Sequence, residues 1–234
     1  MSLSLAADPA FESQRRTMVD RQIRPFDVTE HVVIARFVEV PREIFLPKTL
    51  VPFAYSDMAL KIPREGRDEP RTMLSPAVLA RLIQAAAIKP SDTVLDVAAA
   101  TGYSTAILSG LAARVTALES SEAKAAIIKA NLARLGIANA RAFAGTLTGG
   151  VAGESPFDVI IVNGTVEAHL EQLFQQLRSG GRLITIVRKT TAPGYGASHA
   201  VRFESLGAQV SSSFLFDSDG TILTAFRKEP EFVF

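Results

Sequence analysis

The sequence predicts a three-layer α/β protein, in which helices cover a mostly parallel sheet that ends in an antiparallel hairpin. The main observation is that short apolar runs alternate with helical runs from Thr93 onward, as in successive strand–helix–strand crossovers. A second observation is that two extended runs, 200–216 and 221–227, flank the tight-turn pair Asp219-Gly220. With 234 residues, of which 47% are hydrophobic, the chain can bury the core of one large domain.

The N-terminal part, residues 1–75, is expected to form an arm of helices and irregular segments within a single domain that spans 1–234. A helix is predicted over 11–24, and Pro25 stops it because the proline ring disfavours helical backbone at the preceding residue. A second helix is predicted over 27–40. The stretch that follows is rich in proline and lacks periodicity, so it is expected to wrap irregularly on the core.

The α/β core is predicted to occupy residues 76–234. Ser75 and Pro76 begin its first helix, because serine suits the N-cap and proline suits the first helical position. A flexible connector is expected over 189–198. The predicted strands cover 93–97, 114–118, 140–144, 157–162 and 182–187, and the predicted helices between them cover 102–112, 121–136 and 166–181.

Composition excludes several classes of function. Lys plus Arg number 25 against 24 for Asp plus Glu, so no overall field attracts nucleic acid or an anionic membrane. The absence of cysteine rules out disulfides and thiolate chemistry and fits a reducing compartment. The three histidines lie too far apart for a short-spaced metal motif, so no metal is expected. Without a signal-like or membrane-spanning apolar run, a soluble cytoplasmic protein is expected.

The candidate ligand site is the turn DVAAATGY, residues 96–103, which follows the first predicted strand of the sheet. Parallel sheets bind ligands outside the carboxyl ends of their strands. The next strand ends in Glu119, 21 positions after Ala98, where a carboxylate can accept two hydrogen bonds from ribose hydroxyls. The alternative is that Glu119 is a solvated carboxylate at a strand end.

This turn fits a methyltransferase template better than a dinucleotide-binding template, although neither fit is complete. The dinucleotide pattern GxGxxG would need glycine at 98, 100 and 103, and the sequence has none of the three. The methyltransferase pattern has an acidic residue followed by glycines at 98, 100 and 102. Asp96 and Gly102 match it.

Six segments carry a more specific resemblance: VPREIFLP (40–47), AYSD (54–57), VLDVAAATGYSTAIL (94–108), VTALE (115–119), PFDVIIVNG (156–164) and QLRSGGRLITIV (176–187). In this order they resemble the motifs of the protein-L-isoaspartate O-methyltransferase family. The resemblance implies a Rossmann-like methyltransferase fold with a seven-stranded sheet and S-adenosyl-L-methionine as cofactor. It also implies methyl transfer to the carboxylate of L-isoaspartyl residues in damaged proteins, a protein-repair reaction.

The resemblance further implies a set of site residues. Thr72 and Ser75 lie in the acceptor motif and are the candidate catalytic residues, while Asp57 and Asn163 are candidate substrate contacts. Structural alternatives stay open, since Ser75 would also serve as a helix cap and Asn163 as a helix start. The candidate cofactor-binding residues are Asp96, Ala98, Ala100, Gly102, Tyr103, Glu119, Ser120, Gly145, Thr146 and Leu147.

The sequence departs from the family's pattern in three motifs. Ala98 and Ala100 replace glycines in a turn that resembles GTGSGY in the family, and each added β-carbon can exclude a ligand. Thr146 stands where the family shows GDG, whose aspartate receives the adenine amino group, and a neutral acceptor is roughly half as strong as a charged one. Leu74 stands at the serine of a TISQP-like motif.

These departures leave two other hypotheses open. The first is a non-catalytic relative that keeps the fold as a binding module, because all three departures fall in the cofactor and acceptor sites while the packing motifs are largely intact. The second is methyl transfer to a small-molecule carboxylate or hydroxyl.

Overall fold

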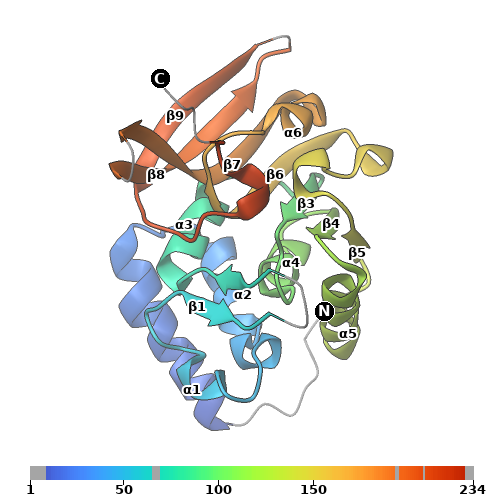
Figure 1. Ribbon diagram of the computed structural model, residues 1–234. Helices are drawn as coiled ribbons and strands as arrows, with labels where there is room; N and C mark the ends of the chain where they lie inside the picture. Colours follow the sequence, from blue (N-terminus) through green and yellow to red (C-terminus); the bar gives the residue numbers. More distant parts are fainter. Residues whose placement is uncertain (1–8, 65–68, 193–194, 208, 230–234) are drawn as a thin grey trace.

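The computed structural model describes residues 9–64, 69–192, 195–207 and 209–229. Within them the main sheet consists of β3 (Thr93–Val97), β4 (Arg114–Glu119), β5 (Ala140–Ala144), β6 (Phe157–Val166), β7 (Leu177–Ala192), β8 (Tyr195–Ser205) and β9 (Val210–Asp217). Their order in space is β5-β4-β3-β6-β7-β8-β9 (Figure 1). Pairing is parallel from β5 to β7 and antiparallel from β7 to β9. The predicted fold class is confirmed.

The N-terminal arm contains both predicted helices, although Pro25 lies within a helical turn and the second helix begins only at His31. Helix α1 (Pro9–Met18) continues through a π-helical turn, Val19–Ile23, and a 3₁₀ turn, Arg24–Phe26. Helix α2 (His31–Glu39) ends before Pro41. Apolar side chains of the arm belong to a core cluster that they share with the sheet.

The segment between the arm helices and the core is more regular than expected. It contains two 3₁₀ turns, Arg42–Phe45 and Val51–Phe53, and a small hairpin in which β1 (Leu60–Ile62) pairs antiparallel with β2 (Arg71–Met73). Strands of three residues are too short for their alternation to be visible in the sequence. This hairpin contacts the carboxyl ends of β4 and β6, and therefore lies over the predicted ligand site.

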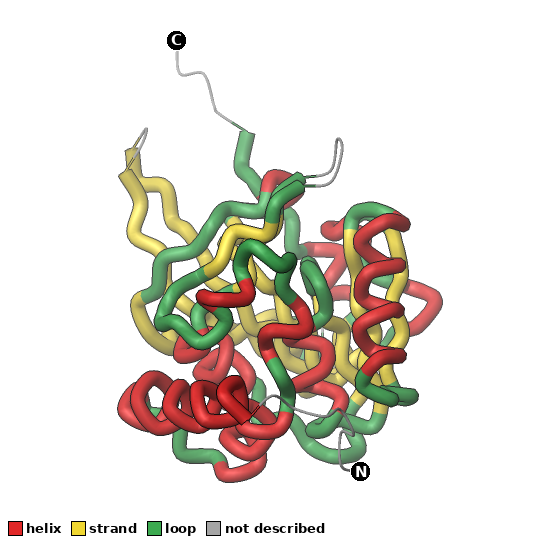
Figure 2. Tube along the Cα trace, turned by 90° about the horizontal axis from the view of Figure 1, so that it is seen from below, coloured by secondary structure: helices red, strands yellow, loops and turns green. Residues whose placement is uncertain are grey.

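Two layers cover the two faces of the sheet, because successive side chains on a strand point to opposite faces. Val94 and Val115 face a large cluster formed with helices α1 and α2 and with α3 (Pro76–Ala85), α4 (Tyr103–Ser109) and α5 (Glu122–Arg134). Leu95 and Leu118 face a smaller cluster, whose covering elements are the short α6 (Glu171–Gln175) and 3₁₀ turns. In Figure 2 the helices of the arm lie together beside the strands.

The prediction of one continuous helix over 166–181 is wrong. β6 continues to Val166, α6 has five residues, and β7 already begins at Leu177, opposite Phe157. The apolar spacing of this stretch imitates a helix, but the backbone hydrogen bond from the Phe157 N–H to the Gln176 carbonyl (2.8 Å) draws the chain into the sheet. Gly180, with φ at 77°, permits the irregularity that follows.

The antiparallel end of the sheet is confirmed, but its strands are not the predicted ones. β7 and β8 pair with each other across most of the expected connector 189–198, of which 193–194 lie outside the described residues. The run 200–216 folds back on itself near Gly207 (φ 83°) to give β8 and β9. Asp219-Gly220 is therefore not the hairpin turn. Residues 1–8 and 230–234, including most of the C-terminal EPEFVF, also lie outside the described residues.

Candidate active site

The turn after β3 keeps a glycine-like backbone although two of its residues are alanine. Ala98 and Ala100 have φ of 56° and 54°, and Gly102 has φ of 95°, so all three lie in the left-handed region. A non-glycine residue there costs roughly 1–2 kcal/mol. Three hydrogen bonds hold the turn: the N–H groups of Ala98, Ala100 and Gly102 donate to the Leu118 carbonyl (3.0 Å), Glu119 Oε1 (2.8 Å) and the Ala99 carbonyl (2.8 Å).

Asp96 supports this turn from below. Its side chain is completely buried and accepts hydrogen bonds from the hydroxyls of Ser104 (2.8 Å) and Thr105 (2.6 Å) at the start of α4. The amide nitrogen of Asn163 donates to Asp96 Oδ1 (2.6 Å) and to the Val97 carbonyl (3.0 Å). Burial raises the pKa of Asp96 to about 6, against the lowering effect of these hydrogen bonds. Asp96 and Asn163 thus fix the turn to its neighbouring strand.

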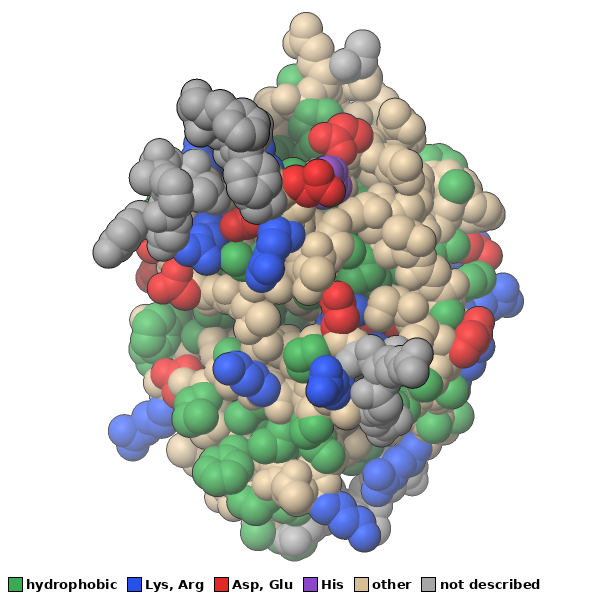
Figure 3. All heavy atoms as spheres, viewed as in Figure 1, with side chains coloured by type: hydrophobic (Ala, Val, Ile, Leu, Met, Phe, Trp, Pro, Cys, Tyr) green, Lys and Arg blue, Asp and Glu red, His purple; other side chains and the backbone are tan. Residues whose placement is uncertain are grey.

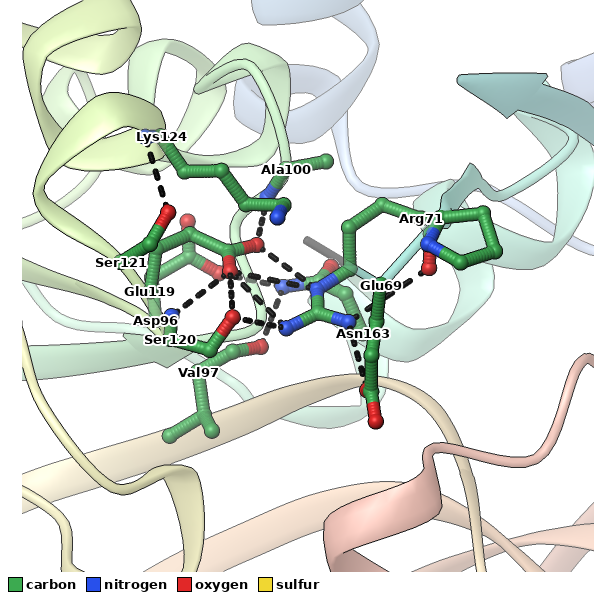
Figure 4. A network of polar contacts seen from close by, with 11 residues as sticks. Glu69, Arg71, Asp96, Val97, Ala100, Glu119, Ser120, Ser121, Lys124 and Asn163 are labelled. Atoms are coloured by element: carbon green, nitrogen blue, oxygen red, sulfur yellow. Dashed lines mark hydrogen bonds and ion pairs between the residues drawn. The ribbon is translucent and has the colours of Figure 1, made fainter. Parts of the chain in front are cut away.

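Glu119, the predicted ribose acceptor, is bound by an arginine of the hairpin. Arg71 Nε lies 3.0 Å from Glu119 Oε1 and 3.2 Å from Oε2, and Arg71 Nη2 lies 3.0 Å from Oε2 and 2.8 Å from the Ser120 hydroxyl. Both side chains are buried, with exposed fractions of 2% and 0%. Figure 4 shows the Arg71 guanidinium with Glu119 and Ser120 on one side and Glu69 on the other. The Glu69 carboxylate lies 3.3 Å from Arg71 Nη1.

A small cavity joins the acceptor motif to the turn. Its volume is about 20 Å³, which holds about one water molecule. Thr72 and Leu74 line it from the hairpin side, Ala98 and Ala100 from the turn, and Asn163 from β6. The fold therefore brings together residues that the sequence predicts as catalytic, cofactor-binding and substrate-binding.

A larger cavity of about 290 Å³ lies beside the turn, between the arm and α5. Apolar side chains such as Leu46 and Ile62 form much of its wall, and Arg71, Thr101 and Asn131 are among its polar lining. Arg71 therefore borders both Glu119 and an open space.

The remaining predicted residues differ in their surroundings. Tyr103 is buried, where its ring packs against Phe37 and Phe45 and the Arg42 guanidinium lies over it. Asp57 is exposed in the loop before β1. Neither it nor Ser75 is among the residues that line the two cavities just described.

Four further predicted site residues lie at the helix cap and in the loop after β5. Ser75 occupies the N-cap position of α3 without a side-chain cap hydrogen bond. The N–H of Gly145 donates to the Glu119 carbonyl (2.8 Å), so this loop is tied to β4. Thr146 is exposed, whereas Leu147 is buried in the smaller core cluster. Cofactor contacts of these residues remain predictions.

Sequence reasoning missed two residues of the site. Arg71 directly precedes the acceptor motif, but nothing in its neighbours indicates that its side chain reaches Glu119. Thr221 follows the last strand, and its hydroxyl lies 2.8 Å from that of Thr72, so the C-terminal segment also closes over the hairpin. The space-filling view shows basic and acidic side chains interspersed on this face of the molecule (Figure 3).

The part of the chain that the structure describes contains neither a membrane-spanning helix nor a cluster of metal ligands. None of its helices is long and apolar enough to cross a membrane. Among the same residues, no group of three or more His, Cys, Asp or Glu side chains could hold a metal ion.

Comparisons with known sequences agree on one family. The model of the family Protein-L-isoaspartate(D-aspartate) O-methyltransferase (PCMT) matches residues 13–194. A protein-L-isoaspartate O-methyltransferase of Koribacter versatilis is 36% identical over 183 residues, which cover 77% of this chain and 80% of that protein. One from Methanoculleus marisnigri is 33% identical and covers 78% and 80% respectively.

Solved structures agree with this. A protein-L-isoaspartate O-methyltransferase superposes with a TM-score of 0.78 at 26% identity, over 89% of this chain and 65% of the other, so that the present chain spans about two thirds of that protein. A beta-aspartate methyltransferase (PCMT) from Plasmodium falciparum, solved in complex with S-adenosyl-L-homocysteine, gives a TM-score of 0.71. It covers 92% of this chain and 98% of its own, and at 17% identity it supports the fold alone.

Proposed function

Since the chain belongs to the protein-L-isoaspartate O-methyltransferase family, we propose that it transfers a methyl group from S-adenosyl-L-methionine to the carboxylate of L-isoaspartyl residues in damaged proteins. The observation that carries this proposal is the small cavity at which the acceptor motif meets the cofactor turn. Thr72 and Leu74 approach the turn at Ala98 and Ala100 there, although hairpin and turn are separate in the sequence.

The reaction asks little acid–base chemistry of the protein. A carboxylate is already ionised at neutral pH, so the nucleophile needs no general base. When bound, the cofactor's sulfonium supplies an electrophilic methyl group. The protein then has to align the two reactants and exclude water. Buried residues around the small cavity suit that task, and Thr72 contributes a hydroxyl beside it.

The residues at the ends of β3, β4 and β5 are of the types that could hold the cofactor, on one condition. The turn has the left-handed backbone for which glycine is usually needed, and Glu119 provides a carboxylate at the end of β4 for ribose hydroxyls. Gly145 and Thr146 follow the neighbouring strand β5, where an adenine would be held. The condition is that the Glu119 carboxylate is bound by Arg71, so the ribose position opens when this pair separates.

The proposal is tested by transfer of a labelled methyl group to a synthetic peptide that contains one L-isoaspartyl residue. The matched control is the same peptide with an ordinary aspartyl residue. We expect base-labile methyl ester on the isoaspartyl peptide and none above background on the control. Equal labelling of both peptides, or of neither at saturating cofactor, would contradict the proposed substrate.

The closed cavity also favours a second candidate, a binding module without catalysis. A volume of about 20 Å³ is far below the roughly 300 Å³ or more of ordinary ligand pockets. This candidate predicts that the isoaspartyl peptide binds but carries no ester after prolonged incubation with cofactor. Ester formation with repeated turnover would exclude it.

A further inference from the structure

Glu119 has no acceptor capacity left for a ligand. A carboxylate offers about four hydrogen-bond acceptor positions. Arg71 supplies two donors, Nε and Nη2, and the backbone N–H groups of Ala100 (2.8 Å) and Ser120 (2.9 Å) supply two more. Ribose hydroxyls would have to replace some of these donors. The two backbone donors are fixed within the turn and the strand end, so Arg71 is the partner that can leave.

The Arg71 guanidinium offers Glu119 the same kind of donors as the ribose that it would exclude. A guanidinium edge and a pair of ribose hydroxyls both present two donors to one carboxylate. Arg71 comes from β2, on a hairpin outside the main sheet, and its side chain is 2% exposed where it meets Glu119. The fold has therefore placed a substitute donor pair at the position predicted for the ribose.

The same strand closes the neighbouring space. Thr72 follows Arg71 and pairs with the Thr221 hydroxyl at 2.8 Å, which links the hairpin to the C-terminal segment. Met73 and Leu74 continue the chain along the small cavity beside the turn. A cavity of about 20 Å³ cannot hold the amino-acid part of the cofactor. The ribose position and this cavity are thus closed by one continuous segment, 71–74.

We propose that the Arg71–Glu119 pair is a latch that keeps the site closed, and that S-adenosyl-L-methionine or its demethylated product displaces Arg71 from Glu119 on binding. This inference rests on the proposed function, from which the displacing ligand is taken. Apparent affinity for the cofactor is then reduced by the fraction of molecules in which the latch is open.

Arg71 has a place to go when it leaves Glu119. Its side chain already lines the cavity of about 290 Å³ between the arm and α5. Its Nη1 lies 3.3 Å from the Glu69 carboxylate, which is more exposed than Glu119 and can keep the cation paired outside the core. Displacement therefore leaves the cation paired with Glu69, while the buried Glu119 carboxylate exchanges its arginine donors for the neutral ribose hydroxyls.

The test is the affinity of S-adenosyl-L-homocysteine, measured by titration calorimetry on the full chain and on Arg71→Met. We expect Arg71→Met to bind at least tenfold more tightly, because the ligand no longer competes with the guanidinium. The matched control is Arg182→Met, which removes another buried, ion-paired arginine (Arg182 to Asp92, 2.7 Å) away from the turn. Its affinity should equal that of the wild type. Equal or weaker binding by Arg71→Met overturns the latch.

A second measurement uses the wild type, in case Arg71→Met fails to fold. The measurement is the NMR signal of the Arg71 Nε–H group, which is assigned by its absence in Arg71→Lys. On saturation with S-adenosyl-L-homocysteine its chemical shift should change, and its proton should exchange faster with water. A signal that stays in place with ligand bound overturns the latch while leaving the proposed function intact. Binding by neither protein contradicts both proposals. Binding by Arg71→Met alone shows that Arg71 closes the site, but it contradicts displacement of Arg71 by the ligand and cofactor use by the wild type.

Discussion

Asp96→Asn isolates the cost of keeping a carboxylate in the core beneath α4. Asparagine has nearly the same shape and retains Oδ1 for the donor from Asn163. Its amide nitrogen would face Ser104 and Thr105, whose hydroxyls can rotate to accept. The substitution therefore removes the charge and keeps the hydrogen-bond pattern.

The expected gain in the free energy of unfolding follows from the pKa of Asp96. Burial raises it from its ordinary 3.8 to about 6, so the folded protein holds the proton more tightly than the unfolded chain does. The wild type loses stability as pH rises from about 4 to about 6, and the loss is complete above that window. At about 1.4 kcal/mol per pH unit, it amounts to about 3 kcal/mol, of which roughly half falls above pH 5.

The assay is urea unfolding of both proteins at several pH values. We expect Asp96→Asn to be more stable by about 3 kcal/mol near pH 8 and by about half as much near pH 5. Asp92→Asn is the control, because Asp92 is also buried but pairs with Arg182. It should destabilise by about 3–5 kcal/mol, since a buried cation loses its partner. A less stable Asp96→Asn at pH 8, or a difference independent of pH, would refute the reasoning.

Three further predictions concern the strain in the turn, the ionisation of Tyr55 and the contact at Thr146. Ala98→Gly and Ala100→Gly should each raise the free energy of unfolding by up to about 1 kcal/mol, because they remove the strain of a left-handed alanine. Ala99 is not left-handed, so Ala99→Gly should lower the free energy of unfolding. A change of the same sign at all three positions would contradict this account. Burial and the neighbouring Glu43 carboxylate raise the pKa of Tyr55, so Tyr55 should stay protonated at about pH 11. Tyr55→Phe should therefore leave the tyrosinate absorbance at that pH unchanged. A loss equal to one tyrosine's signal would contradict the raised pKa. Thr146→Asp should tighten S-adenosyl-L-homocysteine binding about fivefold by providing a charged acceptor, and unchanged calorimetric affinity would argue against an adenine contact there.

The sheet could be predicted because its information is local. Strands such as β3 and β5 are short apolar runs with the predicted bounds. Helix α5 ends at Arg134, just before Gly136, which has φ of 66°. The stretch 166–181 could not be predicted, since its helical spacing is overridden by pairing with β6. Tertiary pairing of this kind leaves no periodic signal in one sequence.

The sequence predicts which carboxylates lie at the candidate site, but not which side chains bind them. Asp96 and Glu119 follow from the strand pattern and the resemblance, and both carboxylates lie at the turn. Their partners come from distant segments: Asn163 is 67 residues from Asp96, and Arg71 is 48 residues from Glu119. Sequence spacing alone says nothing about contacts at such separations, which depend on how the arm folds over the sheet.

Glu119 has two tasks, and this determines how substitutions at the site can be interpreted. Its Oε1 accepts the Ala100 N–H and thereby holds a left-handed alanine in place, while the same carboxylate binds Arg71. A variant at Glu119 would release the turn and the latch together, so lost cofactor binding would not identify a ribose contact. Arg71 variants change the latch and leave the bond between Glu119 and Ala100 in place. Affinity gained in Arg71→Met would therefore report on the latch with the turn still held, and would also indicate that Ala98 and Ala100 do not themselves close the site.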